Sequence, residues 1–213
     1  MAGWPSKVKS ELSLTSKAGA RLGARFNLEP VDSSNKRRLP GGQHGIPRDV
    51  VERNQRERLI AAMAEVCAER GYAAVAVADI TRQASVSTAS FYKQFEDKQA
   101  CLLASFEELL GRLLEAVEGA CEGEIEPDAK VKAGIRVAAE LLAGDIPTAR
   151  LLTVEILAGG SEGVRRQHAA IERLAVLANL DWPSVGAMVA LVARRIVNEE
   201  GPTAAELESC ISL

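Results

Sequence analysis

The chain has 213 residues, a formal net charge of −3 and 47% hydrophobic residues, but only 4% aromatic ones. This length allows one or two domains, whose core has to be built mainly from Ala, Val, Leu and Ile. No apolar run reaches the roughly 18 residues that cross a bilayer, and residues 1–30 lack the apolar block of a signal peptide. We therefore expect a cytoplasmic protein with no membrane partner.

The four cysteines are far apart in the sequence and form no CxxC pair. This spacing is typical of buried thiols in a reducing compartment and not of disulfides or metal ligands. The residues concerned are Cys67, Cys101, Cys121 and Cys210.

Charge is distributed unevenly along the chain. Residues 1–48 carry nine basic and three acidic side chains, whereas the remainder carries 17 basic and 26 acidic ones. Residues 1–47 show no sustained periodicity and contain the Pro-, Gly- and Ser-rich stretch LEPVDSSNKRRLPGGQHGIPR, which predicts a disordered basic tail. Such a tail suggests a polyanion as partner and would add nonspecific affinity for it; a solvated tail without a partner is the alternative.

Helical periodicity begins near Val50. Leu59, Met63 and Val66 share one face at 3.6 residues per turn, and Gly71 is a helix stop. Two short helices are expected next, at 77–84 and 88–94, followed by a longer helix that starts near Asp97.

The rest of the chain also has helical patterns, and no strand pattern is convincing. The expected helices span 128–143, 146–158, 162–179, 183–199 and 203–212, and a proline stands where each of four first turns would accept one, at Pro127, Pro147, Pro183 and Pro202. The sequence therefore predicts an all-α fold with about nine helices.

The stretch SVSTASFYKQFEDK has the features of a helix-turn-helix. Val86 and Phe91 can lock the two short helices together, and Ser87 can cap the second one by accepting from the amide of Ser90. Small side chains would let this second helix approach DNA in the major groove. The helix that starts at Asp97-Lys98 would offer free amides and a lysine to a phosphate.

Residues 54–105 resemble the DNA-binding domain of the TetR family of transcriptional regulators. The resemblance rests on AERGY, VADI, SVSTASFYKQF and DKQACLLAS, which occur in the family's order. It implies a homodimer that binds a palindromic operator in double-stranded DNA, usually as a repressor, and is released by a small molecule in the C-terminal domain. No cofactor is expected. The expected DNA contacts are Gln83, Ser87, Thr88, Ala89, Ser90, Tyr92, Lys93 and Lys98.

Several residues depart from the family pattern. Ser85 stands at the usual turn glycine, which tends to need a positive φ. Ala76 replaces the usual Ser or Thr cap of the helix at 77–84, so the capping box with Asp79 is half missing. Ala89 also replaces a common glycine. These departures leave open a second interpretation, a TetR-like helical interaction protein with impaired DNA reading.

The C-terminal part contains no nucleophile elbow, P-loop or GxGxxG motif. His168 has no partner at metal-ligand spacing and is expected at the surface, whereas Phe106 and Trp182 are expected in the core. We therefore expect that the protein is not an enzyme; a helical enzyme with an unrecognised site is a third interpretation.

The expected organisation is a disordered basic tail at 1–47, a DNA-binding domain at 50–114, and an effector-binding and dimerisation domain at 115–213. Apolar residues surround most of the helix at 183–199, which predicts dimerisation through the last two helices. Charges at Val189 and Val192 are then expected to give folded monomers.

Overall fold

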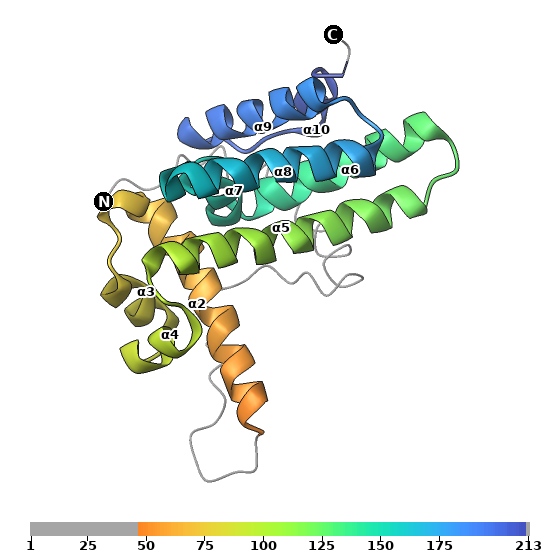
Figure 1. The fold of residues 1–213 in the computed structure, drawn as a ribbon. Helices are drawn as coiled ribbons and strands as arrows, with labels where there is room; N and C mark the ends of the chain where they lie inside the picture. Colours follow the sequence, from red (N-terminus) through yellow and green to blue (C-terminus); the bar gives the residue numbers. More distant parts are fainter. Residues whose placement is uncertain (1–46, 212–213) are drawn as a thin grey trace, which may run out of the picture. The chain divides into compact units, whose positions relative to one another are not determined.

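The computed structural model describes residues 47–211, and the predicted tail at 1–47 lies outside this range apart from Pro47. All regular structure in the described range is helical, which confirms the predicted all-α class. The elements are α2 (Arg48–Arg70), η1 (Tyr72–Ala74), α3 (Val77–Ala84), α4 (Thr88–Gln94), α5 (Lys98–Glu122), α6 (Pro127–Gly144), α7 (Ile146–Thr153), η2 (Glu155–Gly159), α8 (Gly160–Ala178), α9 (Trp182–Val197) and α10 (Ala204–Glu208) (Figure 1).

Local sequence signals predict boundaries of the first four helices, α2 to α5. Helix α2 stops at Gly71, which has φ +72° and donates its N–H to the carbonyl of Cys67 at 2.8 Å. Helices α3 and α4 have the predicted bounds. Helix α5 begins after Asp97, whose side chain accepts from the amide of Ala100 at 2.7 Å.

Three of the four prolines lie in a first helical turn, as predicted. Pro127, Pro147 and Pro183 occupy the first or second positions of α6, α7 and α9. The prediction for Pro202 is wrong. Thr203 caps α10 through its hydroxyl oxygen, which accepts from the amide of Glu206 at 3.3 Å, so Pro202 precedes the cap.

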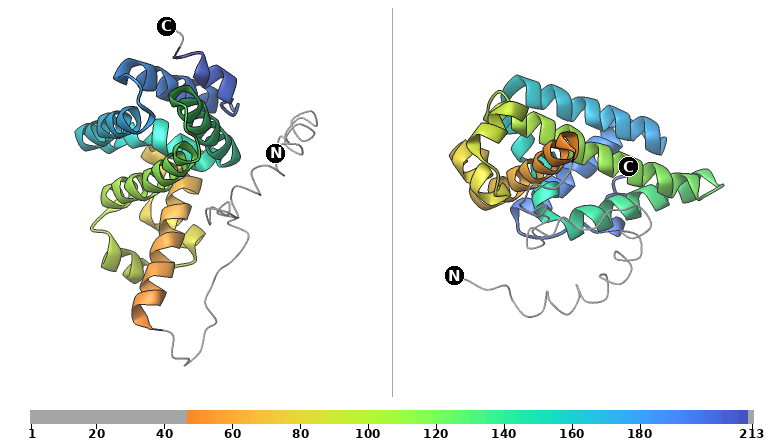
Figure 2. Two further views of the ribbon diagram at one scale, coloured as in Figure 1. Left: turned by 90° about the vertical axis from the view of Figure 1, so that its right-hand side faces the viewer. Right: turned by 90° about the horizontal axis from the view of Figure 1, so that it is seen from below.

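Helix α5 connects helices α2 to α4 with the C-terminal helices. It contacts α2 at its start and runs beside α6 and α8 further along, while α3 and α4 lie next to α2 (Figures 1 and 2). Phe106 on α5 is buried, as predicted. Trp182 is 46% exposed, so its assignment to the core is wrong: it is the first residue of α9, one turn before that helix's first buried side chain.

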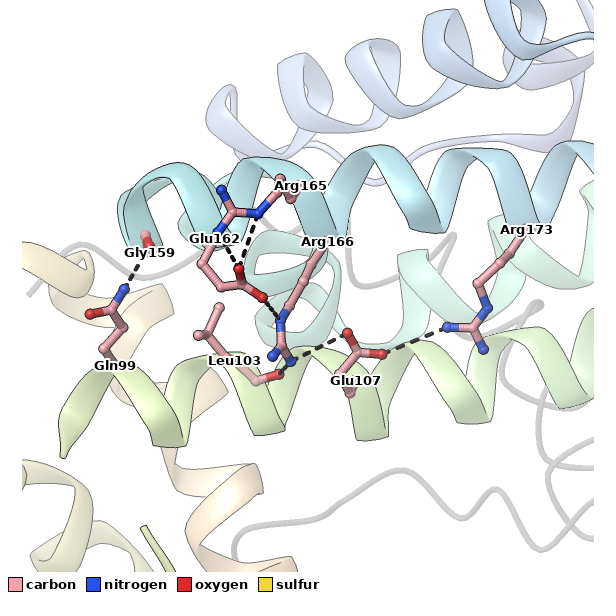
Figure 3. A network of polar contacts seen from close by, with 8 residues as sticks. All are labelled: Gln99, Leu103, Glu107, Gly159, Glu162, Arg165, Arg166 and Arg173. Carbon is pink, nitrogen blue, oxygen red and sulfur yellow. Dashed lines mark hydrogen bonds and ion pairs between the residues drawn. The ribbon is translucent and has the colours of Figure 1, made fainter. Parts of the chain in front are cut away.

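Polar contacts also tie α5 to α8 outside the core (Figure 3). The carboxylate of Glu107 on α5 lies 3.4 Å from Arg166 and 3.6 Å from Arg173, both on α8. Gln99, near the start of α5, donates to the carbonyl of Gly159, the last residue of η2 immediately before α8, at 2.8 Å. The two helices are therefore held together at several points along their length.

The described cysteines are all free thiols, and Cys67, Cys101 and Cys121 are buried as predicted, while Cys210 is half-buried. Burial raises the pKa of the Cys67 and Cys101 thiols to about 12. Both side chains therefore remain protonated at neutral pH and behave as small apolar groups in the core.

Within residues 47–211, no single helix is long and apolar enough to cross a membrane. The segments Glu155–Ala178 and Trp182–Val197 together have the length and apolar composition of a span, but they are bent by 118° at the break between them.

Candidate nucleic-acid interface

The turn between α3 and α4 contains a residue in the left-handed region. Ser85 has φ 50° and ψ 45°, so the positive φ expected from its position is confirmed. The guanidinium of Arg58, on α2, donates to the carbonyls of Ala84 and Ser85. These bonds help to hold the turn in its left-handed conformation although Ser85 is not a glycine. No local pattern in the sequence indicated this role for Arg58.

The start of α3 has half of a capping box, as predicted from Ala76. Ala76 has no side-chain oxygen to offer, but its N–H donates to Asp79 Oδ2 at 3.0 Å. Asp79 Oδ1 also lies 3.1 Å from both Arg70 and Arg82. The Ala76 N–H bond, followed by the two arginines, lowers the pKa of the Asp79 carboxyl below its usual value.

This lowered pKa predicts a pH dependence of stability. The folded state binds the Asp79 proton more weakly than the unfolded state, so the stabilisation is complete above about pH 4, the ordinary range of an aspartate, and is lost as the pH falls through the folded-state value. We expect the Asp79→Asn variant to lose less stability than wild type between pH 5 and pH 3. Urea unfolding at several pH values in this range measures the free energy of unfolding of both proteins. An equal loss in wild type and in Asp79→Asn would contradict the expectation.

Helix α4 has one buried and one exposed face. Phe91 and Phe95 are buried with ring centroids 5.5 Å apart, which fixes the helix against the rest of the domain. Ser87 accepts from the amide of Ser90 at 3.0 Å, which confirms the predicted cap. The outward residues of this segment are Ser87, Thr88, Ala89, Tyr92 and Lys93, with Ser90 half-buried beside them.

The structure therefore places six of the eight predicted DNA contacts on α4 and its cap, five of them exposed and Ser90 half-buried. The other two are engaged within the chain. Gln83 is exposed on α3, and its side-chain amide donates to the carboxylate of Glu65 on α2. Lys98 donates to the carbonyls of Tyr72 at 3.0 Å and Val75 at 2.7 Å.

The N-terminus of α5 also has an internal partner, because the Asp97 carboxylate accepts from its first turn. An acidic cap stabilises a helix N-terminus and competes with an external anion there. A phosphate contact by Lys98 or by these amides stays a prediction.

Helices α5 to α10 line a partly open apolar cavity of about 100 Å³. None of the described residues that line it is charged, and its polar side chains are those of Thr153 and Gln167. The Thr153 hydroxyl donates to the carbonyl of Ala149 at 2.7 Å, and the Gln167 amide donates to the carbonyl of Thr153 at 3.1 Å. The cavity therefore suits an apolar group.

Comparison with known proteins agrees with this geometry. Residues 59–105 match the family model described as "Bacterial regulatory proteins, tetR family". The chain is 31% identical over 99 residues to the fatty acid metabolism regulator protein of Bacillus subtilis (strain 168), which covers 46% of this chain and 51% of that protein. It is 33% identical over 92 residues to the HTH-type transcriptional regulator BetI of Rhizobium meliloti (strain 1021), and this match covers 43% of this chain and 45% of that protein. The chain thus spans about half the length of these curated relatives.

Solved structures share the fold over a longer stretch. The regulator FadR of Bacillus subtilis, in complex with stearoyl-CoA, aligns with a TM-score of 0.64 at 21% identity, covering 74% of this chain and 96% of that one. The fatty acid degradation regulator FadR of Bacillus halodurans aligns with a TM-score of 0.64 at 19% identity, covering 75% and 93%. The family match therefore assigns residues 59–105, with the helix-turn-helix and its exposed α4 face, to the tetR family of bacterial regulatory proteins, and the solved structures show that the fold is shared over about three quarters of the chain.

Proposed function

We propose that the protein is a homodimeric transcriptional repressor that binds a palindromic operator through α4 and is released by a small molecule. The observation that carries this proposal is the α4 face, which exposes small and hydrogen-bonding side chains within the matched domain. Its turn forms despite Ser85, which weighs against the interpretation as an interaction protein with impaired DNA reading.

The exposed residues of α4 would divide into two roles. Thr88, Ala89 and Lys93 would face base edges in the major groove, whereas Ser90 and Tyr92 would donate to phosphates. Tyr92 is 56% exposed, and its ring packs edge-on against the buried Phe91 at 5.4 Å between centroids, so the tyrosine is held at the surface.

Selection of binding sites from randomised duplexes tests these roles. We expect wild type to select a palindrome, and Lys93→Ala to relax the preference at defined positions. Tyr92→Phe should weaken binding to all sequences about equally without changing the selected site, because a phosphate contact carries no base information. Selection of no common sequence by wild type would contradict the proposal.

The C-terminal cavity would hold the apolar part of the effector. Since its described lining has no charge, a carboxylate or phosphate would have to stay at the mouth or outside. A fatty acyl chain with its polar head outside has this chemistry, and stearoyl-CoA is the ligand named for one protein of similar fold. The effector-binding part would share α5 with the DNA-binding part, because α5 continues unbroken through residue 114 and lines the cavity.

Dimerisation would use the outer face of α9, with α10 beside it, so that two copies of α4 can reach one palindrome. Ala187 and Ala190 are exposed on α9 and small enough for a partner helix to approach closely, and Val197 is 58% exposed. The choice of Val192 as an interface residue is wrong: it is only 3% exposed, in the chain's own core. Val189 lines the cavity and is half-buried, so it is also a poor probe.

A further inference from the structure

A buried carboxylate connects the C-terminal helices to the DNA-binding part. Glu155 opens η2, and its side chain is 8% exposed. Its Oε1 lies 2.9 Å from Nε of Arg150 at the end of α7, and its Oε2 accepts from the backbone N–H of Tyr72 at 2.8 Å. Tyr72 lies 83 residues earlier in the chain, in the short η1 segment between α2 and α3.

The η1 segment is held from a second direction. The Lys98 ammonium donates to the carbonyls of Tyr72 and Val75 and lies 4.2 Å from the centre of the Tyr72 ring. Both backbone polar groups of Tyr72 therefore bond to charged side chains from other elements, Glu155 on one side and Lys98 on the other. This arrangement fixes the start of α3, and through it the position of the helix-turn-helix.

Glu155 is also close in sequence to the apolar cavity. Leu152 and Thr153, at the end of α7, line the cavity, and Glu155 follows Thr153 by two residues, at the start of η2. Gln167 on α8 lines the cavity too, and its amide donates to the carbonyls of Leu152 and Thr153 at 3.5 and 3.1 Å. Anything that fills the cavity and moves Gln167 would displace the end of α7 and, with it, the Glu155 carboxylate.

We propose that Glu155 is a positioning residue that transmits occupancy of the cavity to the helix-turn-helix through the Tyr72 amide. The inference deepens the proposed regulation and rests on it for its biological role. Filling the cavity shifts the end of α7, the Glu155–Tyr72 bond lengthens or breaks, and η1 and α3 lose part of their support. By thermodynamic linkage, a partner that holds α3 and α4 in place also favours one arrangement of the junction between α7 and η2.

Hydrogen exchange of the full chain tests this without DNA. The cavity is filled in two ways, by the Ala170→Leu substitution in its lining and by added stearoyl-CoA. We expect either one to accelerate exchange of the amides in η1 and α3 by about tenfold, the change that loss of one charge-assisted hydrogen bond produces. In Glu155→Gln, which keeps an acceptor but loses the charge facing Arg150, and in Glu155→Ala, these amides should already exchange faster and respond little to filling.

The matched control is Glu162→Gln. Glu162 also pairs with arginines, Arg165 and Arg166, but on the surface between α8 and α5 and not at η1 (Figure 3). This variant should keep the wild-type response. The proposal is overturned if neither form of filling changes exchange in η1 and α3 of wild type, or if the Glu155 variants respond as wild type does. A failure of the proposed repressor function would instead appear as absence of specific DNA binding, which this experiment does not use.

Discussion

Replacing Phe91 with alanine is expected to destabilise the folded protein by about 3–5 kcal/mol, because the removed ring leaves a cavity that the neighbours fill only in part. Phe91 is fully buried and contacts the ring of Phe95. Its loss detaches α4 from the domain, so DNA binding should disappear together with stability. Urea unfolding followed by circular dichroism measures the first effect.

The neighbouring residue provides the control. Tyr92→Ala removes a ring of similar size that is 56% exposed, and should change the free energy of unfolding by about 1 kcal/mol or less. It should nevertheless weaken DNA binding, because the Tyr92 hydroxyl is a proposed phosphate donor. If the two variants were equally unstable, the assignment of opposite faces to these residues would be wrong.

Two substitutions on α9 are expected to separate dimerisation from folding. Ala190 is exposed, so Ala190→Glu should leave the fold intact but place like charges near each other across a two-fold axis, raising the dimer dissociation constant by about 100-fold, or ~3 kcal/mol. Val192→Asp should instead unfold the chain, since it buries an unpaired carboxylate in the core.

Sedimentation at micromolar concentration distinguishes these outcomes. Ile125→Glu, at a loop position that is 90% exposed, is the control for added charge and should remain a dimer. A folded Ala190→Glu dimer with unchanged affinity would exclude this face of α9 from the interface.

The part of the fold predicted best from the sequence is the part fixed by neighbours along the chain. The bounds of α3 and α4 follow from the Ser87 cap and the left-handed turn at Ser85, which are both local signals. The prediction for Pro202 failed because a proline is accepted before a helix cap as well as after it. The capping box of Thr203 and Glu206 is the stronger signal for the start of α10.

The rest of the fold and of the candidate site depends on contacts between segments that are distant in the sequence. Apolar residues surround α9, so periodicity could not tell which face meets the chain's own core, and Val192 was assigned to the wrong one. The exposure of Trp182 likewise follows from where the start of α9 lies and not from its residue type. The bonds of Arg58 and Lys98 to carbonyls join residues 23 to 27 positions apart, and that of Glu155 spans 83, beyond the reach of any local pattern.

The central claim is that this chain reads DNA with α4 and is released by an effector with an apolar chain. Fluorescence anisotropy of the full chain on a labelled duplex from the DNA upstream of its own gene tests it most directly, with a scrambled duplex as reference and with stearoyl-CoA or free CoA added. We expect tight binding to the upstream duplex at moderate salt, at least 100-fold weaker binding to the scrambled one, and release by stearoyl-CoA but not by CoA alone. Equal affinity for both duplexes, with no response to stearoyl-CoA, would contradict the claim.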